Sequence, residues 1–219
     1  MTTPCDSCLL VSIVGKNLFI ATKNSGKMAE FEQMLRNCAV RILPMGTIDM
    51  PDAEETGKTF LENAKIKAEA ARLLVPKKVA TMGDDSGLCI DALSGGPGIY
   101  SSRYAEGDYS KAMDRILAKL SWVGDGERGA HFSCVLHVIA PDGSRHIFEE
   151  SVEGVIASER RGKGFGYSPI FIANGHSKTF GEMSMEEKNK ISPRGLAVKK
   201  FIRWLELFGA AWESSPPRG

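Results

Sequence analysis

The spacing of apolar residues predicts a strand, a helix and a second strand near the beginning of the chain. The apolar run at 18–21 indicates a short buried strand, and residues 40–43 fit a second strand. Between them, Met28, Phe31 and Leu35 follow the i, i+3, i+7 spacing of one helix face. A strand–helix–strand unit of this kind usually places its two strands in parallel.

The middle of the chain is predicted to add a second helix, a third strand and a third helix. Residues 44–58 are rich in proline, glycine and acidic residues, and this composition indicates a loop. A helix then begins at Thr59, which forms a capping-box pattern with Glu62. The apolar run 79–82 predicts the next strand, and residues 108–120 predict a helix with one apolar side.

The last third of the chain is predicted to form an antiparallel hairpin and a long final helix. Residues 131–140 alternate partly between apolar and polar, and residues 145–157 resume the extended pattern after a turn signal. Ser192 and Pro193 are typical of a helix cap and the first helical position. The apolar stripe of this helix is predicted to contain Val198, Phe201, Ile202, Leu205 and Phe208.

Length and composition indicate a mixed α/β globular domain. The chain has 219 residues, of which 42% are hydrophobic and 25% charged. We predict a single domain over residues 17–208, between a flexible N-terminal extension at 1–16 and a disordered tail at 209–219. The net charge of +1 does not indicate a general binder of nucleic acids, and no apolar run reaches the roughly 20 residues that a membrane crossing needs.

The cysteines favour a reducing compartment. Cys38, Cys89 and Cys134 lie inside apolar segments, which is typical of buried free thiols. Cys5 and Cys8 have the spacing of metal ligands, but no second pair completes a zinc site. We interpret that pair as part of the N-terminal extension.

Asp84 and Asp85 are the most informative polar residues of the chain. The strand predicted at 79–82 precedes them, and Ser86 and Gly87 are of the kind that turn a chain sharply. Ligand sites of parallel sheets lie at strand ends, and neighbouring carboxylates usually recruit a cation, often Mg²⁺. A solvated turn remains the alternative for this dipeptide by itself.

Three further positions could supply positive charge to the same site. The loop Thr22–Lys27 joins a strand to a helix start and can offer N–H groups to an anion, although it lacks the Walker A spacing. Lys67 lies on the apolar side of its predicted helix, where it either extends to solvent or points into a site. Arg194 opposes the dipole in the first turn of its helix, which a nearby anion would explain.

The remaining motifs are weaker by themselves. The glycine-rich segment Gly162–Tyr167 could bring backbone and an aromatic ring to a base, or could be a flexible loop. Residues 186–190 are typical of a solvated charged turn. Four histidines are scattered, and none belongs to a Ser- or Cys-based triad pattern. Paired acids and several lysines without a covalent nucleophile favour metal-assisted attack of water on phosphorus.

Taken together, these segments resemble the inosine triphosphate pyrophosphatase family, and among its members the bacterial type. The resemblance covers roughly residues 17–208. The matching segments, in family order, are Phe19–Lys27, Ala53–Ala64 with Lys67 and Ala68, Asp84–Gly87, Gly95–Tyr104, Gly164–Phe171 and Glu187–Gly195.

The resemblance implies an α/β fold with a long curved mixed sheet, flanking helices and two lobes around a nucleotide cleft. It implies a cytoplasmic homodimer that requires Mg²⁺. Its activity would be hydrolysis of ITP, dITP and XTP to the nucleoside monophosphate and pyrophosphate, which cleanses the nucleotide pool.

The resemblance also assigns roles to individual residues. Glu54 and Asp85 would bind the metal, and Asp85 would help to activate water while Lys67 contacts phosphate. The substrate-binding residues would be Thr22, Lys23, Asn24, Ser25, Gly26, Lys27, Ser86, Phe165, Gly166, Tyr167, Ser168, Lys188, Pro193 and Arg194.

Two positions depart from the family pattern, and both lie in the half of the site that would recognise the base. Ser168 stands where the family usually has aspartate, and Pro193 stands where it usually has histidine. We therefore predict weaker discrimination against ATP than is usual in the family. A Maf-like pyrophosphatase with another base preference and a nucleotide-binding sensor without turnover remain the alternative functions.

Overall fold

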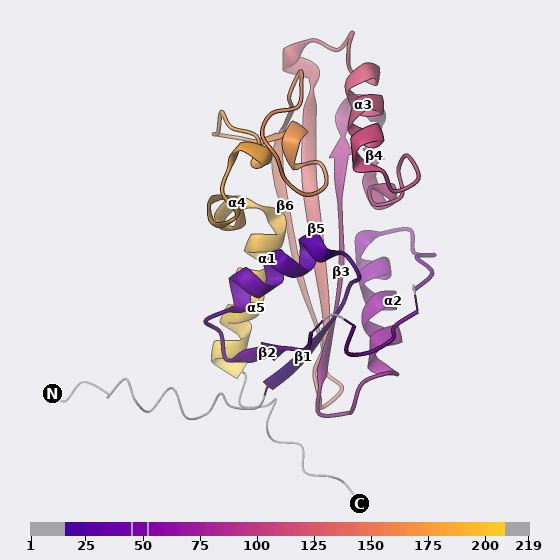
Figure 1. Ribbon diagram of the computed structural model, residues 1–219, viewed down its shortest axis with the longest axis vertical. Coiled ribbons are helices and arrows are strands. Elements are labelled where there is room, and N and C mark those ends of the chain that lie inside the picture. Colours follow the sequence, from indigo (N-terminus) through magenta and orange to yellow (C-terminus); the bar gives the residue numbers. More distant parts are fainter. Residues whose placement is uncertain (1–15, 45, 52, 209–219) are drawn as a thin grey trace, which may run out of the picture.

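A mixed sheet runs the length of the molecule in the computed structural model, which describes residues 16–44, 46–51 and 53–208 (Figure 1). Its strands are β1 (Lys16–Ala21), β2 (Val40–Ile42), β3 (Ala80–Ile90), β4 (Gly96–Pro97), β5 (Gly129–Ile139), β6 (Arg145–Ile156) and β7 (Phe171–Ala173). The α-helices are α1 (Ser25–Leu35), α2 (Phe60–Arg72), α3 (Tyr109–Lys119), α4 (Met185–Ile191) and α5 (Pro193–Phe208). The strand order is β2-β1-β3-β5-β6-β7, with β4 paired to β3.

The predicted strand–helix–strand unit and the predicted hairpin are both confirmed. β1 pairs in parallel with β2 and with β3, and the predicted helix side of Met28, Phe31 and Leu35 is buried. β5 and β6 form an antiparallel pair that runs from Gly129 opposite Val155 to the turn after β5. The predicted α/β class with a long mixed sheet is therefore confirmed.

β3 is much longer than predicted, and Asp84 and Asp85 lie in its middle rather than in a turn after its end. The parallel partner β1 does end here, because Ala21 pairs with Gly83. β3 continues to Ile90 because β5 pairs with it antiparallel along nearly its whole length. This partner supplies hydrogen bonds that a short apolar run could not reveal. The two acids therefore lie beyond the carboxyl end of β1 while their own strand continues.

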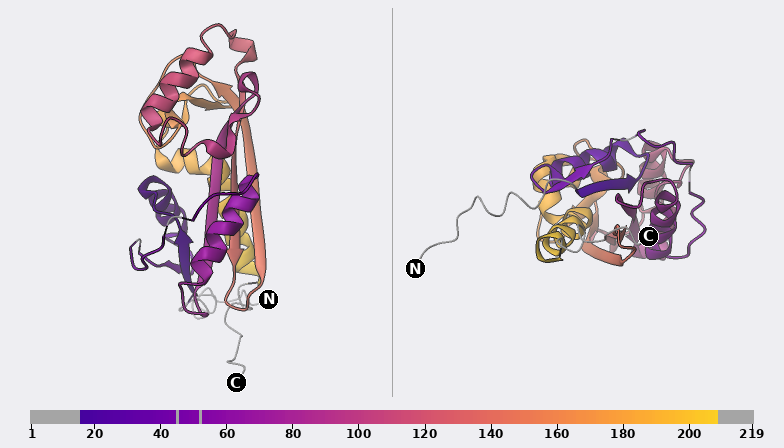
Figure 2. Two further views of the ribbon diagram at one scale, coloured as in Figure 1. Left: turned by 90° about the vertical axis from the view of Figure 1, so that its right-hand side faces the viewer. Right: turned by 90° about the horizontal axis from the view of Figure 1, so that it is seen from below.

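Helices cover both faces of the sheet in the lower half of the molecule (Figures 1 and 2). α1 and α5 pack against one face through a core that includes Phe31, Met82 and Phe201. α2 packs against the opposite face, so close to β3 that a Cβ on Gly83 would lie 1.9 Å from the carbonyl oxygen of Ala64. This contact fixes the distance between α2 and the acidic segment of β3.

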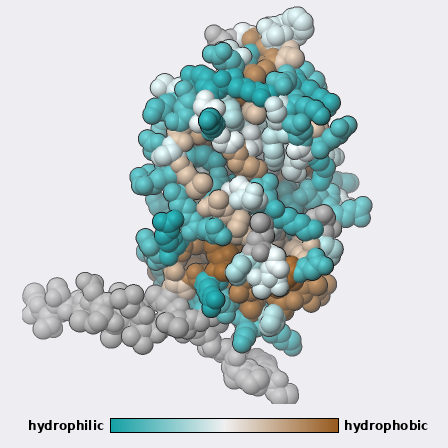
Figure 3. Space-filling model, in the orientation of Figure 1, coloured by the Kyte–Doolittle hydropathy of each residue, from teal (hydrophilic) through white to brown (hydrophobic). Residues whose placement is uncertain are grey.

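A second core lies in the other half of the molecule, around α3 and β7. It contains Leu88 and Ile90 from β3, Ile116 from α3 and Phe171 from β7. Because β3, β5 and β6 run through both halves, the two lobes share one sheet (Figure 2). The face seen in Figure 3 is mostly hydrophilic, and its apolar surface gathers in the lower part, where β1 and β2 lie.

Three local predictions were wrong. Phe208, predicted in the buried stripe of α5, is 57% exposed. Thr59 caps α2 as predicted, but the carboxylate of Glu62 accepts a hydrogen bond from the backbone N–H of Lys58, so the capping box is not completed. Residues 186–190, which by themselves resemble a charged turn, form most of α4 because Ser184 caps them.

The termini are only partly described. The predicted extension at 1–16 and tail at 209–219, with Cys5 and Cys8, lie outside the described residues, except that Lys16 already belongs to β1. Among the helices of the described part, none combines the length and apolar composition that a membrane crossing requires.

Candidate active site

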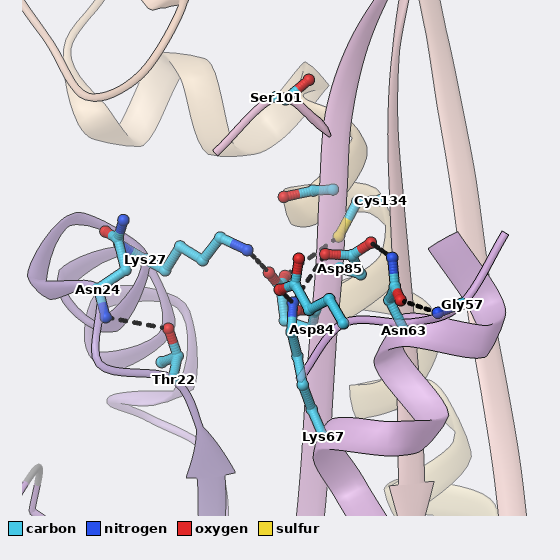
Figure 4. Close-up of polar contacts among 12 residues, drawn as sticks. Thr22, Asn24, Lys27, Gly57, Asn63, Lys67, Asp84, Asp85, Ser101 and Cys134 are labelled. Carbon is cyan, nitrogen blue, oxygen red and sulfur yellow. Dashed lines mark hydrogen bonds and ion pairs between the residues drawn. The ribbon is translucent and has the colours of Figure 1, made fainter. Parts of the chain in front are cut away.

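Asp84 and Asp85 lie on opposite faces of the sheet, because successive side chains of a strand alternate. Asp84 lies on the side of α1 and α5, where Lys27 and Arg194 contact it. Asp85 lies on the side of α2, where Lys67 contacts it (Figure 4). The two acids that were expected to share one cation site are therefore divided between two charge clusters.

Asp84 is the buried centre of the first cluster and is only 1% exposed. Its Oδ1 pairs with Lys27, while its Oδ2 accepts from Nε of Arg194 at 2.9 Å and lies 3.3 Å from Sγ of Cys134. Burial by itself would raise the pKa of Asp84, but Arg194 and Lys27 hold this pKa far below its usual range. Arg194 lies in the first turn of α5, where the helix dipole disfavours a cation, and Asp84 is a nearby anion of the kind that this position predicted.

Glu30 is a second buried acid of this cluster, and the sequence analysis missed it. Its carboxylate pairs with Arg194 on one side and with Lys188 on the other. Burial would raise the pKa of Glu30, yet these two cations keep it below its usual value. One signal was available, because Glu30 follows Lys27 by three residues and precedes Phe31 on a buried side of α1.

Asp85 belongs to the second cluster, on the side of α2. Its carboxylate accepts from Nζ of Lys67 at 2.7 Å and from Nδ2 of Asn63 at 3.3 Å. Lys67 also pairs with Glu55, so its ammonium lies between two carboxylates and does not extend to solvent. Burial raises the pKa of Asp85, and Glu55 adds to this effect, against the opposing influence of Lys67. A carboxylate with a raised pKa is suited to accept a proton from water.

Glu54, to which the family resemblance assigns the metal, and its neighbour Glu55 have different environments. The side chain of Glu54 is exposed, whereas the next residue, Glu55, lies against Lys67 and Arg103 and lines the cleft. These two glutamates lie in a loop with no periodic pattern, so only the family resemblance favours Glu54, whereas the contact with Lys67 favours Glu55.

Glu55 and Asp85 have the chemistry of a magnesium site. Mg²⁺ binds one or two carboxylates and completes its shell with phosphate oxygens and water, and these two carboxylates already flank one cation, the Lys67 ammonium. Within residues 16–44, 46–51 and 53–208, no three or more His, Cys, Asp or Glu residues form a metal-binding group. The donor set therefore fits a metal that is bound together with a phosphate substrate.

The loop 22–27 forms one wall of a cleft of about 650 Å³. Asn24 caps α1 by accepting from the N–H of Lys27 at 3.1 Å, and its own N–H donates to Oγ1 of Thr22 at 3.2 Å. Gly26 is required because a Cβ there would lie 2.6 Å from the ring of Phe165. Lys23 and Ser25 are exposed at this loop.

An adjoining crevice of about 50 Å³ lies at the junction of the lobes. The predicted residues that line it are Lys27, Ser86, Phe165, Gly166, Tyr167, Ser168, Lys188, Pro193 and Arg194. The ring of Tyr109, which the sequence analysis did not single out, packs edge-on against Phe165 and Tyr167 at 5.4 and 5.3 Å between ring centroids. An aromatic wall beside buried cations is suited to a flat ring that carries polar atoms.

The comparisons with known proteins agree with this geometry. The sequence profile of the Ham1 family matches residues 18–204. The dITP/XTP pyrophosphatase of Halalkalibacterium halodurans is 45% identical over 199 residues, which cover 87% of this chain and 100% of that enzyme. The dITP/XTP pyrophosphatase of Bacillus subtilis is 43% identical over 198 residues, covering 89% of this chain and 99% of that enzyme.

Solved structures extend the likeness to the fold. A HAM1 protein from Coxiella burnetii matches with a TM-score of 0.76 and 38% identity, covering 87% of this chain and 98% of that one. The Ham1 protein of Staphylococcus aureus matches with a TM-score of 0.73 and 37% identity, with the same coverage. With its profile matched over almost all of the described residues, this chain belongs to the Ham1 family.

Proposed function

We propose that this protein hydrolyses non-standard purine nucleoside triphosphates, namely ITP, dITP and XTP, to the nucleoside monophosphate and pyrophosphate. The observation that carries this proposal is the arrangement of one cleft with lysines and carboxylates directly beside an aromatic crevice with Lys188 and Arg194. The first can hold a triphosphate and the second a purine. The names of the relatives at 45% and 43% identity support the same reaction.

In the reaction that we propose, Asp85 accepts a proton from the water that attacks the α-phosphorus. Its raised pKa places this carboxylate nearer to the working pH, which favours a general base. Lys67 contacts Asp85 and Glu55, so it can orient the carboxylate and neutralise charge on the phosphate. Lys27 and the N-terminal end of α1 lie on the opposite wall, where they would hold the remaining phosphates.

Mg²⁺ is the cofactor that we propose, held by Glu55 and Asp85. When bound, it would supply positive charge to the phosphate oxygens. Lys67 contacts both carboxylates, so it would add a second positive charge beside the metal.

The base would lie in the crevice, with its ring against Phe165 and its polar edge toward Lys188 and Arg194. Ser86 holds Arg194 through a hydrogen bond of 2.8 Å, so the guanidinium is fixed before the substrate arrives. Pro193 offers no side-chain donor and no N–H, so the base loses a contact there, which supports weaker discrimination against ATP.

We place the enzyme in the cytoplasm, where nucleotide pools are held, and we expect a homodimer, as the family resemblance implies. Light scattering on the purified full chain measures the mass directly. A monomer at micromolar concentration would contradict the dimer without affecting the proposed reaction.

The proposed function is tested by product analysis with a panel of ITP, XTP, ATP, GTP, dTTP and UTP, each with Mg²⁺. We expect pyrophosphate from ITP and XTP, and orthophosphate only after a pyrophosphatase is added. Direct release of orthophosphate from ITP refutes the proposed bond cleavage. Preference for dTTP or UTP would favour a Maf-like enzyme, and binding without turnover would favour a sensor.

A further inference from the structure

Five charged side chains form a continuous chain from the cleft to the crevice. Lys27 pairs with Asp84, Asp84 pairs with Arg194, Arg194 pairs with Glu30, and Glu30 pairs with Lys188. The charges alternate along this chain, and both of its ends are cations. All five side chains are largely buried, with exposed fractions from 0% to 13%.

At the crevice end of this chain of charges, Lys188 contacts a neutral residue, Ser168. Nζ of Lys188 lies 3.2 Å from Oγ of Ser168, and this hydroxyl donates to the carbonyl oxygen of Phe165 at 2.7 Å. Ser168 is 4% exposed and carries no charge. Three cations therefore face two carboxylates, so these five side chains carry one net positive charge, and the Lys188 end of the chain lines the crevice.

The other groups around the crevice do not supply the missing negative charge. Burial raises the pKa of the Tyr109 and Tyr167 phenols and of the Cys134 thiol, so all three are neutral. Burial would also raise the pKa of Glu30 and Asp84, but their cation partners keep both ionised. The described residues that line the crevice include no histidine, the side chain that most often titrates near neutral pH.

We propose that the crevice selects a purine base that carries a negative charge, and that XTP is therefore bound as its xanthine anion in preference to the neutral hypoxanthine of ITP. This inference rests on the proposed function. A xanthine base carries a second carbonyl group, which makes its ring N–H mildly acidic, so that it loses this proton below neutral pH. Hypoxanthine lacks that carbonyl and stays neutral there. An anionic ring would complete the alternation of charge beyond Lys188.

The test is the ratio of kcat/KM for XTP to that for ITP, measured from pH about 5 to about 8. Groups of the enzyme that titrate affect both substrates, so the ratio isolates the base. For the wild type we expect this ratio to rise with pH and to level off once xanthine is ionised. The expected rise is about tenfold, which corresponds to the free energy of one charge-assisted hydrogen bond. A ratio that does not change with pH refutes the inference. If ITP and XTP are both hydrolysed in that case, the proposed function still holds.

Two variants of matched size test the charge itself. Ser168→Asp places a carboxylate beside Lys188 and should remove most of the rise, whereas Ser168→Asn is neutral and should retain it. Ser121→Asp adds the same charge at an exposed position after α3 and should retain the rise too. Equal pH profiles for the Asp and Asn variants would overturn the inference.

A third variant covers the case in which Ser168→Asp does not fold. Lys188→Met removes the uncompensated cation and leaves two cations against two carboxylates. Overall activity should fall for both substrates, because Lys188 lines the crevice, but the ratio should lose its dependence on pH. A rise that persists in Lys188→Met shows that another group recognises the anion and overturns the role assigned to Lys188.

Discussion

At the scale of single residues, the two adjacent acids of β3 have different environments, and this difference favours different roles. Asp84 is held by Lys27 and Arg194 with its pKa far below the usual range, so it has little tendency to accept a proton. Asp85 has a raised pKa and lies beside Lys67. Neighbouring carboxylates whose pKa values are shifted in opposite directions are typical of a division between a structural and a reactive role.

Asp85→Asn should abolish most of the activity without unfolding the protein. The amide keeps the shape and can still contact Lys67 and Asn63, but it cannot accept a proton from water. We expect turnover of ITP to fall by at least ~10²-fold, the lower range for loss of a general base. Pyrophosphate release measures turnover and circular dichroism checks the fold. Unchanged turnover would exclude Asp85 as the base.

Asp84→Asn should mainly lower stability. It removes the carboxylate between Lys27 and Arg194 and leaves both cations buried without their shared partner. Loss of one partner from a buried ion pair costs about 3–5 kcal/mol. Denaturant titration should show this loss, whereas Asp114→Asn, which breaks only an exposed pair with Arg160, should cost less than about 1 kcal/mol. Equal losses in the two variants would contradict the structural role.

At the scale of elements, the close approach of α2 to β3 positions the residues that we propose to be catalytic. Lys67 comes from α2 and Asp85 from β3, so their 2.7 Å contact depends on the distance between the two backbones. That distance is set at Gly83, whose hydrogen atoms face the carbonyl of Ala64. Packing and chemistry are therefore coupled within a few residues of the same strand.

Gly83→Ala should reduce both stability and activity. The new methyl group would lie 1.9 Å from the carbonyl oxygen of Ala64, so α2 must move away from β3 and carry Lys67 with it. Overpacking of this kind costs about 1–3 kcal/mol. Gly124→Ala is the control, because a Cβ there meets nothing within 4 Å. A fully active and stable Gly83→Ala protein would show that the elements can shift without consequence.

The contact of α2 with β5 should make stability depend on pH through His137. This histidine is 2% exposed, its Nδ1 has no hydrogen-bond partner among the described residues, and burial lowers its pKa. Because its pKa is lower in the folded state, the unfolded chain binds the proton more tightly. Its stabilising contribution is therefore complete above the unfolded pKa of about 6.5 and is lost as pH falls below that value.

His137→Leu removes this titration. We expect the free energy of unfolding to fall less in His137→Leu than in the wild type between pH about 7.5 and about 5.5. His176→Leu, at an exposed position, serves as the control and should resemble the wild type. Chemical denaturation at each pH gives the comparison. Parallel pH curves for His137→Leu and the wild type would show that another group causes the dependence.

At the scale of the whole molecule, the ligand should join the two lobes. The cleft is lined mainly by the lower lobe, and the crevice lies where the glycine-rich loop of the upper lobe meets α1, α4 and α5. The crevice of about 50 Å³ is narrow without a ligand, so we expect its walls to move apart when the base enters. A nucleotide that binds both regions would stabilise the opened arrangement.

ITP with Mg²⁺ should therefore stabilise both lobes together against unfolding. The variant Asp85→Asn is used because its slow turnover leaves the nucleotide intact. At a concentration of 100 times Kd, the expected gain is about 2.7 kcal/mol, seen as a higher Tm. Adding Phe165→Ala should reduce the gain for ITP but not for inorganic triphosphate, because only the nucleotide has a base. An equal reduction for both ligands would contradict the placement of the base against Phe165.

The sequence by itself determined most of the elements, because their signals are local. The helix spacing of Met28, Phe31 and Leu35 and the turn between β5 and β6 both led to correct predictions. The order of six short motifs indicated the family and the reaction class. These features depend on residues that lie close together in the chain, so the local sequence pattern is enough to predict them.

Tertiary structure decided which side chains meet. Antiparallel pairing with β5 extended β3 and placed its two acids on opposite faces, and no local pattern contains that partner. The contact of Glu55 with Lys67 involves a loop without a periodic pattern. The burial of Glu30 between Arg194 and Lys188 joins residues more than 100 positions apart. The charge balance of the site is a sum over such distant contacts, so only the folded chain determines it.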